Sequence, residues 1–269
     1  MRNILPQLFI YFTVIVLNIL AHQAVAATTA ANNSTKVTVP QYCTNIKAII
    51  DQTIQPLIIP NNQYANVTNG KFVGAMVGVY HNQTYCYFSY GQINIAPDAP
   101  SPDFDTQFEI GSNTKTFTAL LLQLAAYEGK LGAGTNAGSP LDNPINNFLP
   151  PGYTLPQSTT PITFRMVANF TAGFPDSPLT IYYANYPQTL SNYTSTDFAS
   201  FIASMQLPTT LPTTIANYSN VSYMLLGQIL QFQFNYIDYI SMVSEKILTP
   251  LQLNDTGITP ISANLRMYI

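Results

Sequence analysis

The chain has 269 residues, which is enough for one large domain or two small ones with a buried core. Apolar residues make up 47% of it and charged residues only 8%, where about 25% is usual, so uncharged polar side chains must supply most of the surface. The formal net charge is −3 and no block of basic residues occurs, which argues against nucleic acid or an anionic membrane as a partner.

The first 26 residues have the pattern of a secretory signal peptide. Arg2 supplies the positive charge, an apolar run covers 8–20, and Ala24-Val25-Ala26 provides the small residues of a cleavage site. The alternative is an uncleaved anchor, but this run is shorter than the ~20 apolar residues that a membrane span needs. We therefore expect an exported protein, periplasmic or secreted, that contacts a membrane only through the signal segment if it stays uncleaved.

The first predicted elements form a helix followed by a hairpin. Residues 27–40, rich in Ala, Thr and Asn, are expected to be a disordered lead-in to one domain over 41–269. Apolar residues at helical spacing predict a helix over 43–58. Apolar and aromatic runs over 72–80 and 84–90 flank a short polar turn and predict the start of an antiparallel sheet.

Two cysteines remain after the signal, Cys43 in the helix and Cys86 in the second strand. An even count in an exported chain favours one disulfide. In the chain-entropy model, a loop of this length gives a stabilisation of roughly 4 kcal/mol. Because Cys86 lies in a strand-like run, two unpaired cysteines in the core are the alternative.

The rest of the chain is predicted to be a mostly helical insert over the sheet. An apolar stripe predicts a helix that begins near Ser112 and ends between Gly129 and Gly132. The stretch 132–160 is rich in Pro, Asn and Gly and shows little helical pattern. Further helices are predicted over 163–167, 195–205, 220–231 and 236–248.

The titratable residues argue against several classes of hydrolase. Only two histidines occur, His22 in the signal segment and His81 in the predicted turn, and no Gly-x-Ser-x-Gly motif accompanies them, so a Ser-His-Asp triad is not expected. No metal-ligand spacing and no glycine-rich phosphate loop occur. We expect neither a metal nor a cofactor.

The strongest candidate for chemistry is Ser112-Asn113-Thr114-Lys115. Residues three apart share one face of a helix, so the amine of Lys115 can reach the hydroxyl of Ser112. An unprotonated lysine in a cleft is a competent base for a serine nucleophile, and a helix N-terminus favours negative charge that develops there. Ser-x-x-Lys alone is a weak signal, but this match lies at the start of a strongly amphipathic helix.

The residues around this motif resemble the serine β-lactamase and penicillin-binding-protein family, in particular class C β-lactamases and their DD-peptidase relatives. The resemblance spans 72–256 and implies an α/β fold in which helices flank an antiparallel sheet. Asn169 and Ala172 depart from the family's usual His-Thr-Ser-Gly segment. The similar segments are 108–119, 128–131, 141–144, 163–173 and 250–256.

The family's second motif, Tyr-x-Asn, occurs at 64/66, 80/82, 183/185 and 218/220. Tyr64 and Tyr80 precede the nucleophile, which is the wrong order for the family, and Tyr183 lies in an aromatic loop. Tyr218-Ser219-Asn220 runs into an apolar helical stripe and resembles the family's Tyr-Ser-Asn-x-x-Tyr-x-x-Leu-Gly run. The alternative for these polar residues is ordinary loop and capping chemistry.

The resemblance implies roles for four residues. Ser112 attacks a carbonyl and forms an acyl-enzyme, while Lys115 and Tyr218 share the general-base and proton-relay work. Asn220 binds the amide of the substrate's side chain or holds Lys115 in place. No glutamate lies in the motif that class A enzymes use to activate water, which favours the tyrosine-type mechanism.

The family's third motif, Lys-Thr-Gly or His-x-Gly, lies on a strand well downstream of the second, and none precedes Ile269. We therefore expect a sheet whose C-terminal strands are missing, poor solubility, and little or no turnover. The expected function is a serine hydrolase acting on β-lactams, D-Ala-D-Ala peptides of peptidoglycan, or small esters. The alternatives are a non-catalytic binding or scaffold protein and an inactive truncated product.

Overall fold

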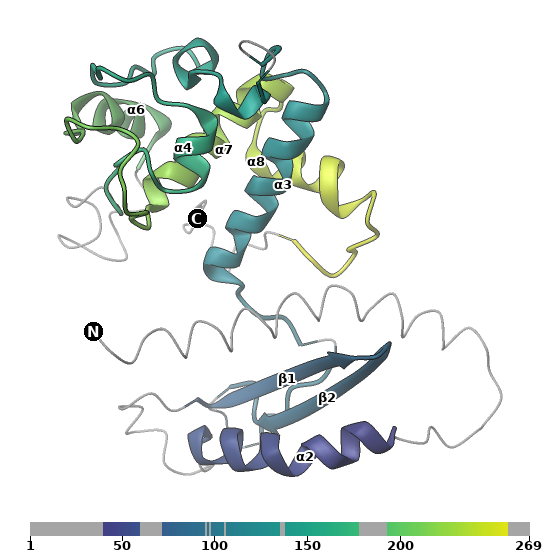
Figure 1. Cartoon of the computed structure of the whole chain (residues 1–269). Helices are drawn as coiled ribbons and strands as arrows, with labels where there is room; N and C mark the ends of the chain where they lie inside the picture. The colour runs from purple at the N-terminus through teal and green to yellow at the C-terminus, as the bar shows by residue number, and fades with distance from the viewer. Residues whose placement is uncertain are drawn as a thin grey trace. The chain divides into compact units, whose positions relative to one another are not determined.

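The computed structural model describes residues 40–59, 72–94, 96, 98–104, 106–134, 138–177 and 193–257. These residues divide into two units, one that ends at Ile110 and one that begins at Gly111 (Figure 1). The predicted signal peptide and nearly all of the predicted lead-in lie outside the described residues, and a single domain over 41–269 stays a prediction. No helix within the described ranges is long and apolar enough to cross a membrane.

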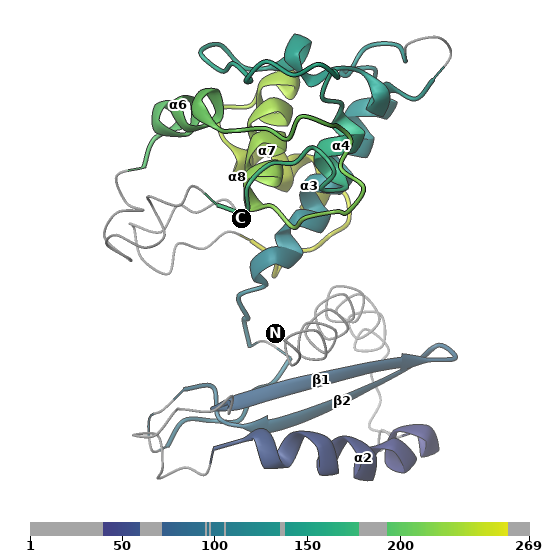
Figure 2. The ribbon, with the colours of Figure 1, turned by 60° about the vertical axis from the view of Figure 1, so that its left-hand side comes forward.

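The first unit consists of one helix on a two-stranded antiparallel sheet, and Figures 1 and 2 both show the helix along the hairpin. The strands pair from Gly74 with Gly91 to His81 with Thr84. Asn82 has φ 46° in the tight turn between them, a left-handed conformation that suits the twist of a hairpin. The elements are α2 (Gln41–Ile54), η1 (Gln55–Leu57), β1 (Gly74–His81) and β2 (Thr84–Gly91).

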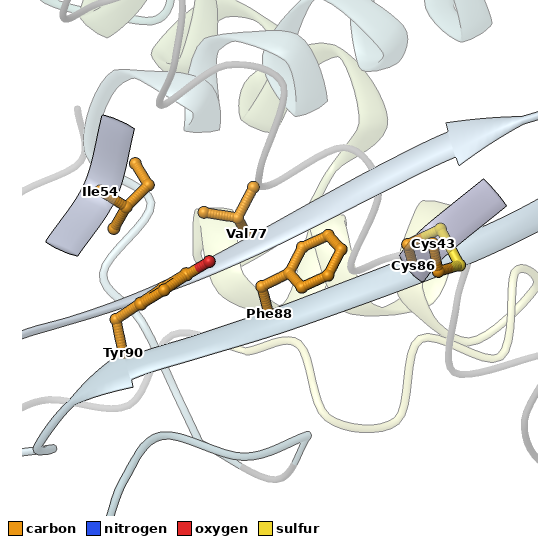
Figure 3. Packing of buried hydrophobic residues seen from close by; sticks show 6 residues of the cluster. All are labelled: Cys43, Ile54, Val77, Cys86, Phe88 and Tyr90. Atoms are coloured by element: carbon orange, nitrogen blue, oxygen red, sulfur yellow. A yellow bond between two sulfur atoms is a disulfide. The ribbon is translucent and has the colours of Figure 1, made fainter. Parts of the chain in front are cut away.

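The core of this unit lies between α2 and one face of the hairpin. Side chains alternate along a strand, so Cys86, Phe88 and Tyr90 of β2 share that face and meet Ile54 and Val77 (Figure 3). The hydroxyl of Tyr90 donates a hydrogen bond to the Asp51 carboxylate of α2 at 2.7 Å. Burial and this hydrogen bond raise the pKa of Tyr90.

The disulfide predicted between Cys43 and Cys86 is present, with the two Cα atoms 5.4 Å apart. It joins the first turn of α2 to the middle of β2, and both residues are almost completely buried. The alternative of two unpaired core cysteines is therefore wrong. His81, the one histidine outside the predicted signal segment, stacks on Tyr42 in this unit with ring centroids 4.7 Å apart.

The second unit is helical, and the part of it that the structure describes contains no strand, only an isolated bridge between Pro144 and Thr163. Its central element, α7 (Asn220–Phe234), packs against three other helices (Figure 2). The elements are η3 (Gly111–Asn113), α3 (Thr114–Tyr127), η5 (Pro140–Asp142), η6 (Ile145–Phe148), α4 (Phe164–Ala168), α6 (Ser195–Ser204), α7 (Asn220–Phe234), α8 (Tyr239–Val243) and the π-helical η8 (Ser244–Leu248).

The central element is α7, which contacts α3, α4 and α8. A helix that is apolar on most sides is stable only when its neighbours cover those sides, and α7 fits this description. Its fully buried residues are Val221, Leu225, Leu226, Ile229 and Leu230.

The predicted helices are present, with shifted ends that capping explains. Asn235 adopts a left-handed conformation and ends α7, three residues beyond the prediction. The helix expected from residue 236 begins instead at Tyr239, because the side chain of Asp238 accepts a hydrogen bond from the amide of Ser241.

Candidate active site

Ser112 lies on the 3-10 turn η3, directly before the first turn of α3. Gly111 before it has φ 49°, a conformation that glycine adopts without strain. No neighbouring atom lies within 4 Å of a Cβ placed on Gly111, so its backbone conformation is what requires glycine. The turn leaves Ser112 exposed at the start of a helix, where a reactant can reach its hydroxyl.

Lys115 occupies the first turn of α3 and is only 7% exposed. Its Nζ donates a hydrogen bond to Ser112 Oγ at 3.2 Å, and another to Asn220 Oδ1 at 2.6 Å. Nζ also lies 4.8 Å from the centre of the Tyr218 ring, a cation–π distance. A buried amine is costly without partners, and these three contacts supply them.

Tyr218 brings a second polar group to Ser112. Its hydroxyl donates a hydrogen bond to Ser112 Oγ at 2.6 Å, although the two residues are 106 positions apart in the sequence. The side chain of Tyr218 is about half exposed, so this contact borders solvent. Ser112 Oγ therefore accepts from both Lys115 and Tyr218.

The three residues of Tyr218-Ser219-Asn220, at the start of α7, have different partners. Ser219 caps the helix, with its Oγ accepting from the amide of Ser222 at 3.0 Å and donating to the carbonyl of Pro175 at 2.7 Å. Ser219 is fully buried, whereas the residues on either side are directed to Ser112 and Lys115. One capping residue thus fixes both functional neighbours.

The segment that ends at Gly173 supports the Tyr218 loop through main-chain hydrogen bonds. The amide of Thr213 donates to the carbonyl of Thr171, and the amide of Asn217 donates to the carbonyl of Phe170. A Cβ on Gly173 would lie 2.5 Å from Cδ of Pro208, so only glycine fits there. The departures from the family pattern within 163–173 therefore affect a supporting segment.

Two further residues complete the surroundings of the site. Tyr223 lies with its ring 6.0 Å from Lys115 Nζ and donates to the carbonyl of Ala168 at 3.1 Å. Burial, and secondarily the nearby Tyr218, raise the pKa of Tyr223. Asp176 accepts a hydrogen bond from Asn220 Nδ2 at 3.1 Å. Sequence reasoning gave neither residue a role, although Tyr223 matches the second tyrosine of the resembled run.

The other candidates from the sequence lie elsewhere. The Tyr-x-Asn copies at 64/66 and 183/185 fall outside the described residues, and Tyr80/Asn82 belongs to the hairpin of the first unit. Two glutamates of the second unit, neither in the motif that class A enzymes use, have other partners: Glu128 pairs with Lys246 at 3.1 Å, and Glu245 forms a hydrogen bond with Tyr236. Within the described ranges, no group of three His, Cys, Asp or Glu residues could hold a metal ion.

The arrangement can move a proton to and from a serine hydroxyl. Two groups that can carry a proton, an amine and a phenol, lie within hydrogen-bond distance of one exposed Oγ. This is the geometry that an activated serine nucleophile requires.

Comparison with known proteins finds the same fold in solved structures. The Yersinia pestis β-lactamase/D-alanine carboxypeptidase has a TM-score of 0.58 at 23% identity, covering 80% of this chain and 57% of that one. The octameric penicillin-binding protein homologue of Pyrococcus abyssi has a TM-score of 0.60 at 21% identity, covering 78% and 43% respectively. These likenesses confirm the predicted α/β fold of the β-lactamase/transpeptidase type.

At the level of sequence, a β-lactamase of Escherichia coli is 28% identical over 223 residues, which is 83% of this chain and 51% of the relative. The chain spans about half, or less, of the length of the curated relatives that it matches. The model of the Beta-lactamase family matches residues 47–265. Because that match covers most of the chain and includes every residue gathered around Ser112, the protein belongs to the Beta-lactamase family.

Proposed function

We propose that this protein is a serine hydrolase in which Ser112 forms an acyl-enzyme. The observation that carries the proposal is the double hydrogen bond at Ser112 Oγ, from Lys115 Nζ at 3.2 Å and from the Tyr218 hydroxyl at 2.6 Å. An ordinary capping serine does not need an amine and a phenol on the same oxygen.

In the first step, Ser112 Oγ attacks a carbonyl carbon while its proton passes to whichever neighbour is unprotonated, the Lys115 amine or the Tyr218 phenolate. The bond from that carbon to the leaving nitrogen or oxygen then breaks, and the leaving atom takes up the proton. A water molecule releases the acyl group by the same relay in reverse and restores the Ser112 hydroxyl. Once the Lys115 amine has taken up the proton, its positive charge, held in place by the bonds to Ser112 and Asn220, stabilises the negative charge that develops at the reacting carbonyl.

The proposed substrates are β-lactams, D-Ala-D-Ala peptides and small esters. The first two correspond to the names of the Yersinia pestis relative, a β-lactamase/D-alanine carboxypeptidase. We also propose that the protein works after export, in the periplasm or outside the cell. The Cys43–Cys86 disulfide supports an oxidising compartment.

The test is covalent labelling of the full chain with a fluorescent penicillin and, separately, with a fluorophosphonate. Peptide mass spectrometry should place the adduct on Ser112, and Ser112→Ala should abolish it. Ser200→Ala, on the exposed face of α6, is the matched control and should label normally. An adduct on another serine would refute the assignment. A folded chain that neither reagent labels would favour the non-catalytic binding or scaffold protein.

A further inference from the structure

The side chain of Asn220 is held at both ends. Its Oδ1 accepts from Lys115 Nζ at 2.6 Å, and its Nδ2 donates to Asp176 Oδ1 at 3.1 Å. Asp176 lies three residues beyond the supporting segment, and its main-chain carbonyl accepts from the amides of Asn220 and Val221 at 2.8 and 3.3 Å. The carboxylate is therefore fixed beside the start of α7 by two bonds of its own backbone.

These contacts decide which way the Asn220 amide points. The oxygen and the nitrogen of an asparagine amide have nearly the same shape, so the group can turn end for end at little steric cost. A lysine ammonium only donates hydrogen bonds, and a carboxylate only accepts them. With Asp176 on one side and Lys115 on the other, the reversed amide would place donor against donor and acceptor against acceptor.

We propose that Asp176 is a positioning residue for acyl transfer at Ser112. Its carboxylate holds the Asn220 amide with Oδ1 toward Lys115, so that the amine stays within reach of the Ser112 hydroxyl. Asp176 acts only through Asn220 and does not touch the reacting atoms. The inference rests on the proposed function, because the effect on acyl transfer requires Ser112 to be the nucleophile.

Two substitutions separate orientation from charge. Asp176→Ala removes the acceptor but keeps the main-chain bonds to α7, whereas Asp176→Asn keeps an acceptor oxygen and loses the charge. We expect Asp176→Ala to slow the maximal rate of fluorophosphonate labelling roughly tenfold and to leave the half-saturating concentration unchanged. The reason is that the variant loses one hydrogen bond from the series that links Asp176 through Asn220 to Lys115. Asp176→Asn should restore most of the rate. Equal rates for all three proteins, or equally poor labelling by Ala and Asn variants, would overturn the role.

A second background distinguishes positioning from general loop stability. In Asn220→Asp, both side-chain oxygens accept, so Lys115 no longer depends on the direction of an amide. The penalty of Asp176→Ala should therefore disappear in this background or turn into a gain, because Asp176→Ala also removes the repulsion between two facing carboxylates. If Asp176→Ala slows labelling by the same factor in both backgrounds, its role is merely structural and the inference fails.

A measurement that does not need labelling keeps the two proposals distinguishable. The side-chain NH2 of Asn220 gives a pair of resonances in a ¹H–¹⁵N spectrum, identified by their loss in Asn220→Asp. Bonded to a carboxylate, these protons should exchange slowly, and Asp176→Ala should speed their exchange and shift them. An unchanged pair would overturn the inference even if Ser112 labels well. A changed pair in a chain that does not label would count against the proposed function alone.

Discussion

The two units hold their key contacts by different means. In the first, the core consists of apolar residues on one face of a hairpin, and the Cys43–Cys86 disulfide joins that face to α2. In the second, the mostly buried helix α7 begins at a turn that brings the Tyr218 phenol to Ser112 and the Asn220 amide to the buried Lys115 amine, which also contacts Ser112.

This difference in core size indicates which unit can bury a polar group at an acceptable cost in stability. The first unit is small and contributes few buried residues, and a covalent link adds stability that does not depend on core size. The second has a larger apolar core around α7, which can offset the cost of burying the Lys115 amine. Polar groups that serve a reaction are therefore expected in the unit with the larger core.

The largest expected effect comes from removing the buried amine. Lys115→Ala should lower the rate of Ser112 labelling by about 10²-fold or more, because a positioned acid–base group typically contributes that much. The free energy of unfolding of this variant should change little, because Lys115→Ala removes a buried amine that is costly to desolvate together with the hydrogen bonds that compensate for it. Labelling kinetics and thermal unfolding measure the two effects.

The control for that variant is Lys130→Ala, at an exposed position just beyond α3. It removes the same charge from the same unit without touching the site, and should label at the normal rate. If Lys115→Ala unfolds the protein while Lys130→Ala does not, the Lys115 amine stabilises the second unit and is not a costly group that the apolar core around α7 offsets.

The next effect concerns the first unit. Reducing the disulfide, or replacing both Cys43 and Cys86 by Ala, should lower the free energy of unfolding of that unit by roughly 4 kcal/mol, because the unfolded chain loses a loop constraint. Hydrogen exchange of the β1 and β2 amides should speed up on reduction, and peptides from α7 provide the internal reference. Unchanged exchange in β1 and β2 would show that the packing of α2 suffices alone.

The sequence was most informative where residues close together in the chain determine the local structure. The apolar and aromatic runs over 72–80 and 84–90 indicated the hairpin. The three-residue interval from Ser112 to Lys115 predicted a contact that the structure shows, with Nζ 3.2 Å from Oγ. Local geometry alone produces both patterns, so they can be found without knowing the fold.

Contacts between distant segments were harder to predict. The bond from Tyr218 to Ser112 was expected only because the surrounding residues resemble a known family. Asp176 lies 44 positions from Asn220 and stands in no motif that was recognised, so nothing in the sequence linked the two. The start of α8 was also misplaced by three residues, since the cap at Asp238 was overlooked.

The smallest effect is a dependence of the second unit on alkaline pH. Burial raises the pKa of Tyr153 from 10.0 to about 12, and its hydroxyl donates to the Ser195 carbonyl at 3.2 Å. Because the folded state holds this proton more tightly than the unfolded state, stability is complete below pH 10 and falls as the pH rises toward 12. Tyr153→Phe has no proton to lose, so its stability should fall less steeply over that range, measured as the unfolding midpoint at each pH.

An exposed tyrosine, Tyr127, offers the control, since Tyr127→Phe should leave the slope of stability against pH as it is. An identical slope in Tyr153→Phe would mean that other groups control the alkaline behaviour of this unit.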